Sequence, residues 1–191
     1  MLGIDIPLFE AENICFAPIH HEKDAEIESR WMHDAGYLRL LNLEPALPAS
    51  PGQRKKRYEA IEKRQEENKD LVYFTIRMRN DERLIGFVRI YRIDWSNGAG
   101  VIQLGIGDPS DRLKGYGSEA LRLALRYAFG ELNLYRLSAN IPDYNSIALH
   151  VFAKAGFAEE VRRRQAINRD GKRWDLIQMG ILFEEWERMQ R

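Results

Sequence analysis

The first 70 residues have the hydrophobic and polar spacing of one strand followed by two helices. Residues 12–19 form a short apolar run that ends near Pro18, which predicts a strand. Residues 22–41 carry apolar side chains four apart, the spacing of a helix with one buried face. Residues 44–52 hold three prolines and predict a loop. Residues 53–70 are dense in opposite charges four apart, which predicts a solvent-exposed helix.

From residue 71 the pattern changes to that of strands. Residues 71–79 and 82–95 are rich in β-branched and aromatic side chains, which predicts a hairpin of two strands. Asn97 and Gly98 supply a turn, and residues 100–108 predict a third strand. The three strands together predict an antiparallel meander.

The last third of the chain returns to helices between strands. Residues 115–132 place alanine and leucine on one stripe, which predicts a helix, and residues 134–141 predict a strand. A second helix is predicted from residue 143 to a stop at Gly156, and two strands surround the turn at residues 169–171. This order predicts a single domain over residues 1–191. We expect an α/β fold with a mixed, mostly antiparallel central sheet flanked by helices, in which one crossover makes two strands parallel.

Composition and charge exclude several classes of protein. The 29 Lys and Arg residues balance the 29 Asp and Glu residues, so no nucleic-acid partner is expected, because such domains usually have a net basic surface. The basic run at residues 54–57 is followed closely by acidic residues, which favours a solvated helix face. No apolar run approaches the roughly 20 residues of a membrane span, so no membrane partner is expected. The N-terminus lacks a secretory pattern, and Cys15 is the single cysteine, which together predict a cytoplasmic location.

Residues 106–120 are the segment most suggestive of chemistry. They leave a strand, turn through Pro109 and enter a helix at Gly115 and Gly117. Glycine-rich backbone at a helix N-terminus leaves N–H groups free to bind phosphate, and no Cβ blocks the approach. With Arg112 and Lys114 nearby, this pattern predicts a site for a cofactor that carries a pyrophosphate.

Two other phosphate-binding patterns fit this segment less well. A nucleotide-triphosphate loop requires a lysine directly after a glycine, whereas Lys114 precedes Gly115. Gly115, Gly117 and Ala120 do match the spacing of a dinucleotide-binding loop. However, seven residues separate the preceding strand from Gly115, and too little α/β alternation follows to build a doubly wound sheet.

The third interpretation is a resemblance to a known family. The sequence R-L-K-G-Y-G at residues 112–117 resembles the cofactor motif of the GNAT superfamily of N-acetyltransferases. The segments at residues 115–129, 144–160 and 169–175 look like its RimJ/RimL-like branch, which acetylates ribosomal-protein N-termini and related amines. W-M-H-D at residues 31–34 resembles a W-x-x-D segment of that branch. The likeness extends from about residue 12 to residue 183.

This resemblance implies that acetyl-coenzyme A binds along the strand and the loop that follows it. Backbone amides at residues 113–118 would hold the pyrophosphate. The strand ending at residues 104–107 would splay from the next parallel strand and pair with the pantetheine arm. Asn145 would touch that arm, and Lys154 would lie toward the nucleotide. The residues so implied are Leu104, Gly105, Ile106, Gly107, Arg112, Leu113, Lys114, Gly115, Tyr116, Gly117, Ser118, Asn145, Phe152 and Lys154.

Direct attack of an amine on a bound thioester requires N–H donors aimed at the developing oxyanion and removal of the amine proton. The backbone of Leu104 and Ile106 is the candidate for the first task, and Asn145 is a further catalytic candidate. Asp34 is the candidate base, and Glu28 and His33 lie on the same segment.

One position departs from the family pattern. Phe152 stands where many relatives have a tyrosine that protonates the departing thiolate, and phenylalanine cannot donate a proton. Tyr144, Ser146 or Tyr116 are alternative donors, as is water, or the thiolate leaves unassisted.

The sequence therefore predicts an N-acetyltransferase that moves an acetyl group to a primary amine in a ternary complex. The acceptor is a protein N-terminus or a small amine, and a homodimer is possible within this family. A catalytically weak acyl-CoA-binding module is the first alternative, and a nicotinamide-dinucleotide-binding protein is the second. The histidines lack metal-ligand spacing, so no metal is expected.

Overall fold

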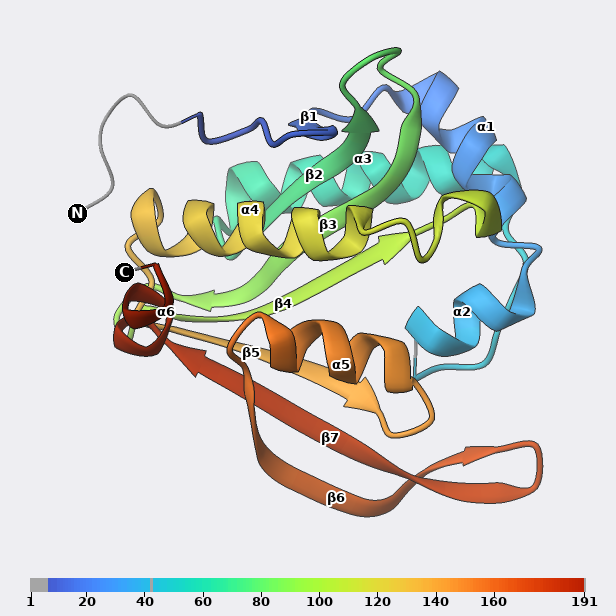
Figure 1. Ribbon diagram of the computed structural model, residues 1–191. Helices are drawn as coiled ribbons and strands as arrows, with labels where there is room; N and C mark the ends of the chain where they lie inside the picture. The colour runs from blue at the N-terminus through green and yellow to red at the C-terminus, as the bar shows by residue number, and fades with distance from the viewer. Residues whose placement is uncertain (1–6, 42, 191) are drawn as a thin grey trace.

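The computed structural model describes residues 7–41 and 43–190, which form a sheet covered by helices (Figure 1). The seven strands lie in the order β1-β2-β3-β4-β5-β7-β6. Their bounds are β1 Ile14–Ala17, β2 Leu71–Met78, β3 Leu84–Asp94, β4 Ala99–Ile106, β5 Arg136–Pro142, β6 Ala158–Arg169 and β7 Lys172–Leu182. The helices are α1 His21–Trp31, α2 Ala35–Leu41, α3 Pro51–Glu67, α4 Tyr116–Gly130, α5 Ser146–Lys154 and α6 Phe183–Met189, with a short 3₁₀ turn at Pro109–Asp111.

The sheet is antiparallel throughout, except where β4 pairs with β5 in parallel. The predicted meander is confirmed as β2, β3 and β4, and the predicted crossover is α4, which connects β4 to β5. The predicted α/β fold with a mixed, mostly antiparallel sheet is therefore confirmed.

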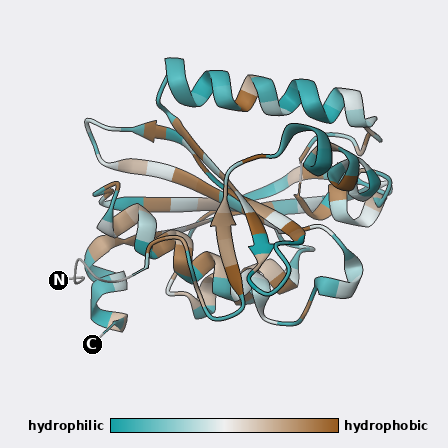
Figure 2. Cartoon of the chain, turned by 90° about the horizontal axis from the view of Figure 1, so that it is seen from above, coloured by the Kyte–Doolittle hydropathy of each residue, from teal (hydrophilic) through white to brown (hydrophobic). Residues whose placement is uncertain are grey.

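Helices pack on both faces of the sheet. Ala25 of α1 and Tyr58 of α3 pack with Tyr73 of β2 and Phe87 of β3. On the other face, α4, α5 and α6 close a larger core cluster that reaches from β1 to β7. Figure 2 shows hydrophobic strands between helices whose outward sides are hydrophilic. Because both faces are covered, the first five residues of β3, Leu84 to Val88, are all buried, which matches their continuous apolar sequence.

The helix predicted over residues 22–41 is in fact two helices. α1 ends at Trp31, and α2 begins at Ala35. Asp34 stands immediately before α2, and its carboxylate accepts the Tyr37 backbone N–H at 3.0 Å. Aspartate at this position satisfies an otherwise free amide and so favours a new helix start over continuation of the old one.

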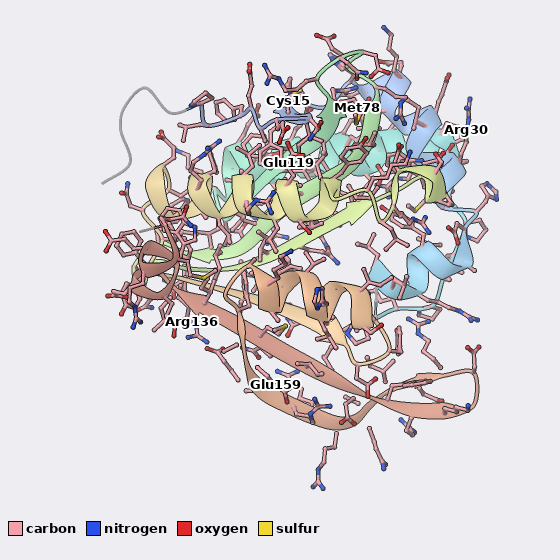
Figure 3. All side chains as sticks on the ribbon, viewed as in Figure 1. Cys15, Arg30, Met78, Glu119, Arg136 and Glu159 are labelled. Carbon is pink, nitrogen blue, oxygen red and sulfur yellow. The ribbon has the colours of Figure 1, made fainter. Side chains whose placement is uncertain are left out.

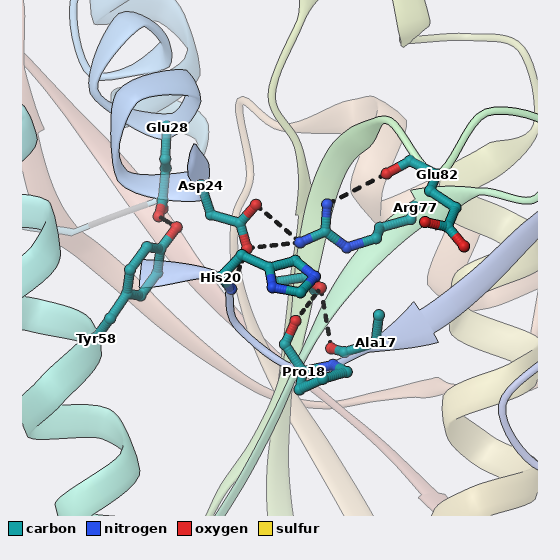
Figure 4. A network of polar contacts seen from close by, with 9 residues as sticks. Ala17, Pro18, His20, Asp24, Glu28, Tyr58, Arg77 and Glu82 are labelled. Carbon is teal, nitrogen blue, oxygen red and sulfur yellow. Dashed lines mark hydrogen bonds and ion pairs between the residues drawn. The ribbon is translucent and has the colours of Figure 1, made fainter. Parts of the chain in front are cut away.

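A buried ion pair fastens α1 to the sheet (Figure 4). Arg77 of β2 donates from one nitrogen to both carboxylate oxygens of Asp24, at 2.8 and 2.7 Å. The same guanidinium donates to the Glu82 carbonyl, and Asp24 also accepts the His20 backbone N–H. Asp24 is 0% exposed and Arg77 is 7% exposed. Because water cannot solvate these two charges, the contacts within the protein must stabilise them instead.

The start of α3 and the presence of α6 both differ from the sequence prediction. α3 begins at Pro51, earlier than the predicted residue 53, because Ser50 and Gln53 form a reciprocal capping box. α6 was not predicted at all. It buries Trp186 against Phe129, with ring centroids 5.3 Å apart.

Glu119 ties α4 to the β1 edge of the sheet. Figure 3 shows Glu119 on α4, with Cys15 on the neighbouring strand. Its carboxylate accepts the backbone N–H of Asn13 at 2.7 Å and the Asn13 side-chain amide at 3.1 Å. The Glu119 carboxylate therefore joins α4 to the segment that leads into β1. No helix within residues 7–41 and 43–190 is long and apolar enough to cross a membrane.

Candidate active site

The parallel pair of strands opens into a cavity. β4 and β5 are paired only where residues 99–101 face residues 136–138, and the rest of β4 has no ladder partner in β5. Beyond this point lies a cavity of about 790 Å³ that reaches β4 at residues 104–106. It is lined by the end of β4, the following loop, the first turn of α4, much of α5 and three residues of α2, namely Tyr37, Leu40 and Leu41.

The backbone of β4 directs free polar groups into this gap. The Gly107 N–H donates to the Ile85 carbonyl of β3 at 2.9 Å. Backbone groups of successive strand residues point to opposite edges, so Leu104 and Ile106 direct theirs toward β5. The predicted splay is therefore present, and it leaves these two amides facing the cavity.

The N-terminus of α4 forms one end of the cavity. Gly115 is the N-cap residue with a φ of +92°, and no side chain caps the helix. The amides of Tyr116, Gly117 and Ser118 therefore have no partner within the helix. A Cβ placed on Gly115 would meet nothing within 4 Å, so the space in front of these amides is open. This arrangement fits the diphosphate that the sequence pattern implies, because an open helix N-terminus favours an anion.

Arg112 contributes to the wall of the cavity as well as to its charge. Its guanidinium pairs with Asp34 at 2.9 Å, donates to the Ile106 carbonyl at 3.2 Å and also donates to the Gly107 carbonyl. It also lies over the ring of Tyr37, 5.3 Å from the centroid. These contacts connect the end of β4 to the start of α2.

The chain can now be compared with known proteins. Residues 13–158 match the family described as "Acetyltransferase (GNAT) domain". The chain belongs to this GNAT family.

Individual GNAT relatives agree with this assignment. The Bacillus subtilis (strain 168) protein named "Uncharacterized N-acetyltransferase YnaD" is 32% identical over 114 residues, which is 59% of this chain. A Vibrio cholerae spermidine N(1)-acetyltransferase is 29% identical over 105 residues, or 55% of this chain. The alignments span 65% and 60% of these relatives' own lengths.

A crystal structure of spermidine N-acetyltransferase from Vibrio cholerae, in complex with CoA and spermine, has a TM-score of 0.79 at 20% identity. The superposition covers 91% of this chain and 98% of the spermidine N-acetyltransferase chain. At 20% identity this similarity shows the fold alone.

Most residues that the GNAT motif implies do gather at the cavity, but some do not. The lining residues among them are Leu104, Gly105, Ile106, Arg112, Leu113, Gly115, Gly117, Ser118, Asn145 and Phe152. The side chains of Lys114 and Tyr116 lie outside the lining. Lys154 lines a second cavity of about 570 Å³ between α4, α5 and α6.

Gly107 is a glycine for a structural reason. A Cβ on this residue would overlap the Trp31 indole, so the tryptophan of the W-x-x-D segment occupies the space beside the strand. The space beside Gly107 is thus filled by the protein itself.

Asp34 is engaged more strongly than its sequence position indicates. The Tyr37 backbone N–H and the Arg112 guanidinium hold the pKa of its carboxyl below the ordinary value. A carboxylate stabilised in its charged form is a weak base, and Asp34 does not line the cavity. The neighbouring candidate Glu28 is buried, where it accepts the Tyr58 hydroxyl and pairs with Arg54 at 2.6 Å.

Asn145 joins two sides of the cavity. Its carbonyl oxygen accepts the Ala148 N–H as the cap of α5, and its amide donates to the Leu40 carbonyl of α2 at 3.2 Å. The Tyr144 hydroxyl donates to the Arg39 carbonyl at 2.9 Å, so this alternative proton donor is already occupied.

Sequence reasoning missed the contribution of α2. Tyr37, Leu40 and Leu41 line the cavity, yet they fall inside what was predicted as one continuous helix. The available signal was Asp34, because an aspartate three residues before Tyr37 has the spacing of a helix cap.

Proposed function

We propose that this protein transfers an acetyl group from acetyl-coenzyme A to a primary amine. The observation that carries the proposal is the divergence of β4 from β5 into a cavity that ends at the uncapped N-terminus of α4. One end of this cavity suits a diphosphate, and the other presents backbone groups of a strand to an extended arm. Membership of the GNAT family and the N-acetyltransferase names of relatives support the same activity.

Different residues along the cavity bind different parts of acetyl-coenzyme A. The amides of Tyr116, Gly117 and Ser118 bind the diphosphate, where the helix dipole adds to their effect. The free amides of Leu104 and Ile106 face the pantetheine arm and donate toward the acetyl carbonyl, whereas the Ile106 carbonyl is held by Arg112. Acetyl-coenzyme A supplies an acetyl group already activated as a thioester.

Transfer itself forms one bond and breaks another. The neutral amine nitrogen attacks the acetyl carbonyl carbon, the nitrogen loses a proton, and the carbon–sulfur bond breaks with its electron pair on sulfur, so that coenzyme A leaves as a thiolate and takes up a proton from water. An alkylamine has a pKa near 10 and a protein N-terminus one of about 7.7–8.0, so either is mostly protonated at neutral pH and must lose a proton to react. Asp34 is held by Tyr37 and Arg112, so we assign it to positioning α2 and leave this proton to water that enters the cavity.

The lining favours an acceptor with a single amine, such as a protein N-terminus, over a polyamine. Asp111 is the one carboxylate among the described residues that line the cavity. Both of its oxygens are engaged by Arg83, at 2.6 and 3.0 Å. A polyamine would need free carboxylates for its further positive charges, and this lining provides none. This acceptor agrees with the ribosomal-protein branch that the motifs resemble.

The proposal is tested by measuring free thiol release from acetyl-coenzyme A. The panel of acceptors contains N-terminal peptides, spermidine, amino acids and an aminoglycoside. We expect turnover with peptides and little with spermidine. Calorimetry on the same protein separates the alternatives. Tight CoA binding without turnover on any amine would favour the acyl-CoA-binding module, and binding of NADH instead of CoA would favour the dinucleotide-binding protein.

A matched pair of glycine variants tests the diphosphate site. Gly115 and Gly171 both have positive φ, at +92° and +70°, and neither has an atom within 4 Å of an added Cβ. Alanine at either position should therefore cost a similar amount of stability, about 1–2 kcal/mol. Only Gly115→Ala, which lies beside the amides, should weaken CoA binding in calorimetry, by about tenfold or about 1.4 kcal/mol. Pantetheine, which has no diphosphate, should bind both variants equally. Equal loss of CoA affinity in both would contradict the site.

A further inference from the structure

The hydroxyl of Tyr37 has no hydrogen-bond partner in the structure. Tyr37 lies on α2, lines the main cavity and is only 4% exposed. A buried tyrosine hydroxyl normally has a partner, because leaving it unpaired costs free energy. Ser118 and Ser146 also line the cavity, but they are half-buried and exposed, so water can reach them. Tyr37 is therefore the one fully buried hydroxyl among the described residues of this wall.

This hydroxyl lies beside the part of β4 that faces the gap. A Cβ placed on Gly105 would be 3.0 Å from the Tyr37 Oη atom. Gly105 stands between Leu104 and Ile106, the two residues whose backbone amides point toward β5. The absence of a side chain at Gly105 thus lets Oη pack directly against the strand, at the same level as the two free amides.

Surrounding contacts hold the Tyr37 ring in this place. Asp34 accepts the Tyr37 backbone N–H at 3.0 Å, and Arg112 covers one side of the ring. The indole of Trp31 packs against the ring edge-on, with centroids 6.4 Å apart. A donor fixed before the ligand arrives needs no reorganisation during the reaction, which is what makes such donors effective.

We propose that the Tyr37 hydroxyl donates a hydrogen bond to the carbonyl oxygen of the bound acetyl thioester, together with the amides of Leu104 and Ile106. This inference rests on the proposed function. Tyr37 keeps its proton throughout, so the atom balance of acetyl transfer is unchanged. Burial, followed by the nearby charge of Glu28, raises the pKa of Tyr37 far above its ordinary value, which keeps the hydroxyl protonated as a donor.

The test uses Tyr37→Phe, which removes only the oxygen atom. Binding of acetyl-coenzyme A labelled with carbon-13 at the carbonyl is followed by difference infrared spectroscopy. In the wild type the carbonyl band should shift to lower frequency on binding, and in Tyr37→Phe this shift should be smaller. Turnover should fall by about 100-fold, as it does when one oxyanion donor is removed, while calorimetry gives an unchanged Kd for CoA. Tyr135→Phe, which alters an exposed tyrosine, is the control and should match the wild type.

Gly105→Ala supplies a second variant, because its Cβ would stand 3.0 Å from Oη and push the hydroxyl away from the strand. It should also reduce the carbonyl shift and turnover, and it decides the matter if Tyr37→Phe does not fold. An identical carbonyl band and unchanged turnover in the variants would overturn the role of Tyr37 and leave the proposed function intact. Failure of the wild type to bind acetyl-coenzyme A would overturn the proposed function, and this inference with it.

Discussion

At the scale of single residues, burial decides how much an ion pair contributes to the stability of the fold. Asp24 and Arg77 form a pair in which the side chains are 0% and 9% exposed. The pair formed by Lys63 and Glu67 lies on the surface of α3, with exposures of 71% and 61%. Attraction between exposed charges is screened by water, whereas a buried charge that loses its partner cannot regain solvent.

We therefore expect Asp24→Ala to destabilise the protein by about 3–5 kcal/mol, because it leaves the Arg77 guanidinium buried without a counter-charge. Urea unfolding followed by circular dichroism measures this free energy. Glu67→Ala is the matched control and should change it by less than about 1 kcal/mol. Similar small effects in both variants would show that the Arg77 charge is satisfied without Asp24.

At the scale of elements, the break between α1 and α2 builds the wall of the cavity that carries Tyr37. The sequence spacing alone favoured a continuous helix over residues 22–41. Asp34 ends the first helix and starts a new one, because its carboxylate caps α2 and also pairs with the Arg112 guanidinium. The partner lies 78 residues further along the chain, so its contribution could not be read from local spacing.

The lowered pKa of Asp34 predicts a specific pH dependence. Its folded-state pKa lies below the unfolded value of about 3.9, so its charge stabilises the fold above that pH. This contribution is lost as pH falls through the folded-state pKa. Asp34→Asn keeps a capping side chain but loses the charge. We expect it to be about 0.5–1 kcal/mol less stable than the wild type at neutral pH, and equally stable at the acid end.

Asp34→Ala removes the cap as well and should cost about 1 kcal/mol more than Asp34→Asn at every pH. Urea unfolding from pH 7 down to the lowest pH at which the fold persists measures all three proteins. A wild-type advantage over Asp34→Asn that stays constant across this range would show that the charge of Asp34 does not stabilise the fold.

At the scale of the whole molecule, the sequence predicted the parts of the fold that depend on local pattern. The meander of β2, β3 and β4 follows from β-branched runs between turn residues, and α4 follows from its apolar stripe. α6 was missed because its seven residues depend on burying Trp186 against Phe129, a contact between distant segments. In the candidate site, the glycines predicted the open helix end. The unpartnered hydroxyl of Tyr37 could not be predicted from the sequence, because it depends on how α2 packs against β4.

The cavity draws its walls from both halves of the chain, so a ligand bound there should stabilise the whole domain. α2 and α5 meet through Asn145 and Leu40, and β4 lines the cavity through residues 104–106. At 100 times its Kd, a ligand that binds only the folded state adds about 2.7 kcal/mol. In a domain of this size each kcal/mol raises the Tm by about 2–4 °C, so acetyl-coenzyme A should raise it by about 5–11 °C. NADH at the same concentration should raise the Tm much less, because it shares the diphosphate but lacks the pantetheine arm that pairs with β4. A shift with NADH and none with acetyl-coenzyme A would contradict the cavity's assignment.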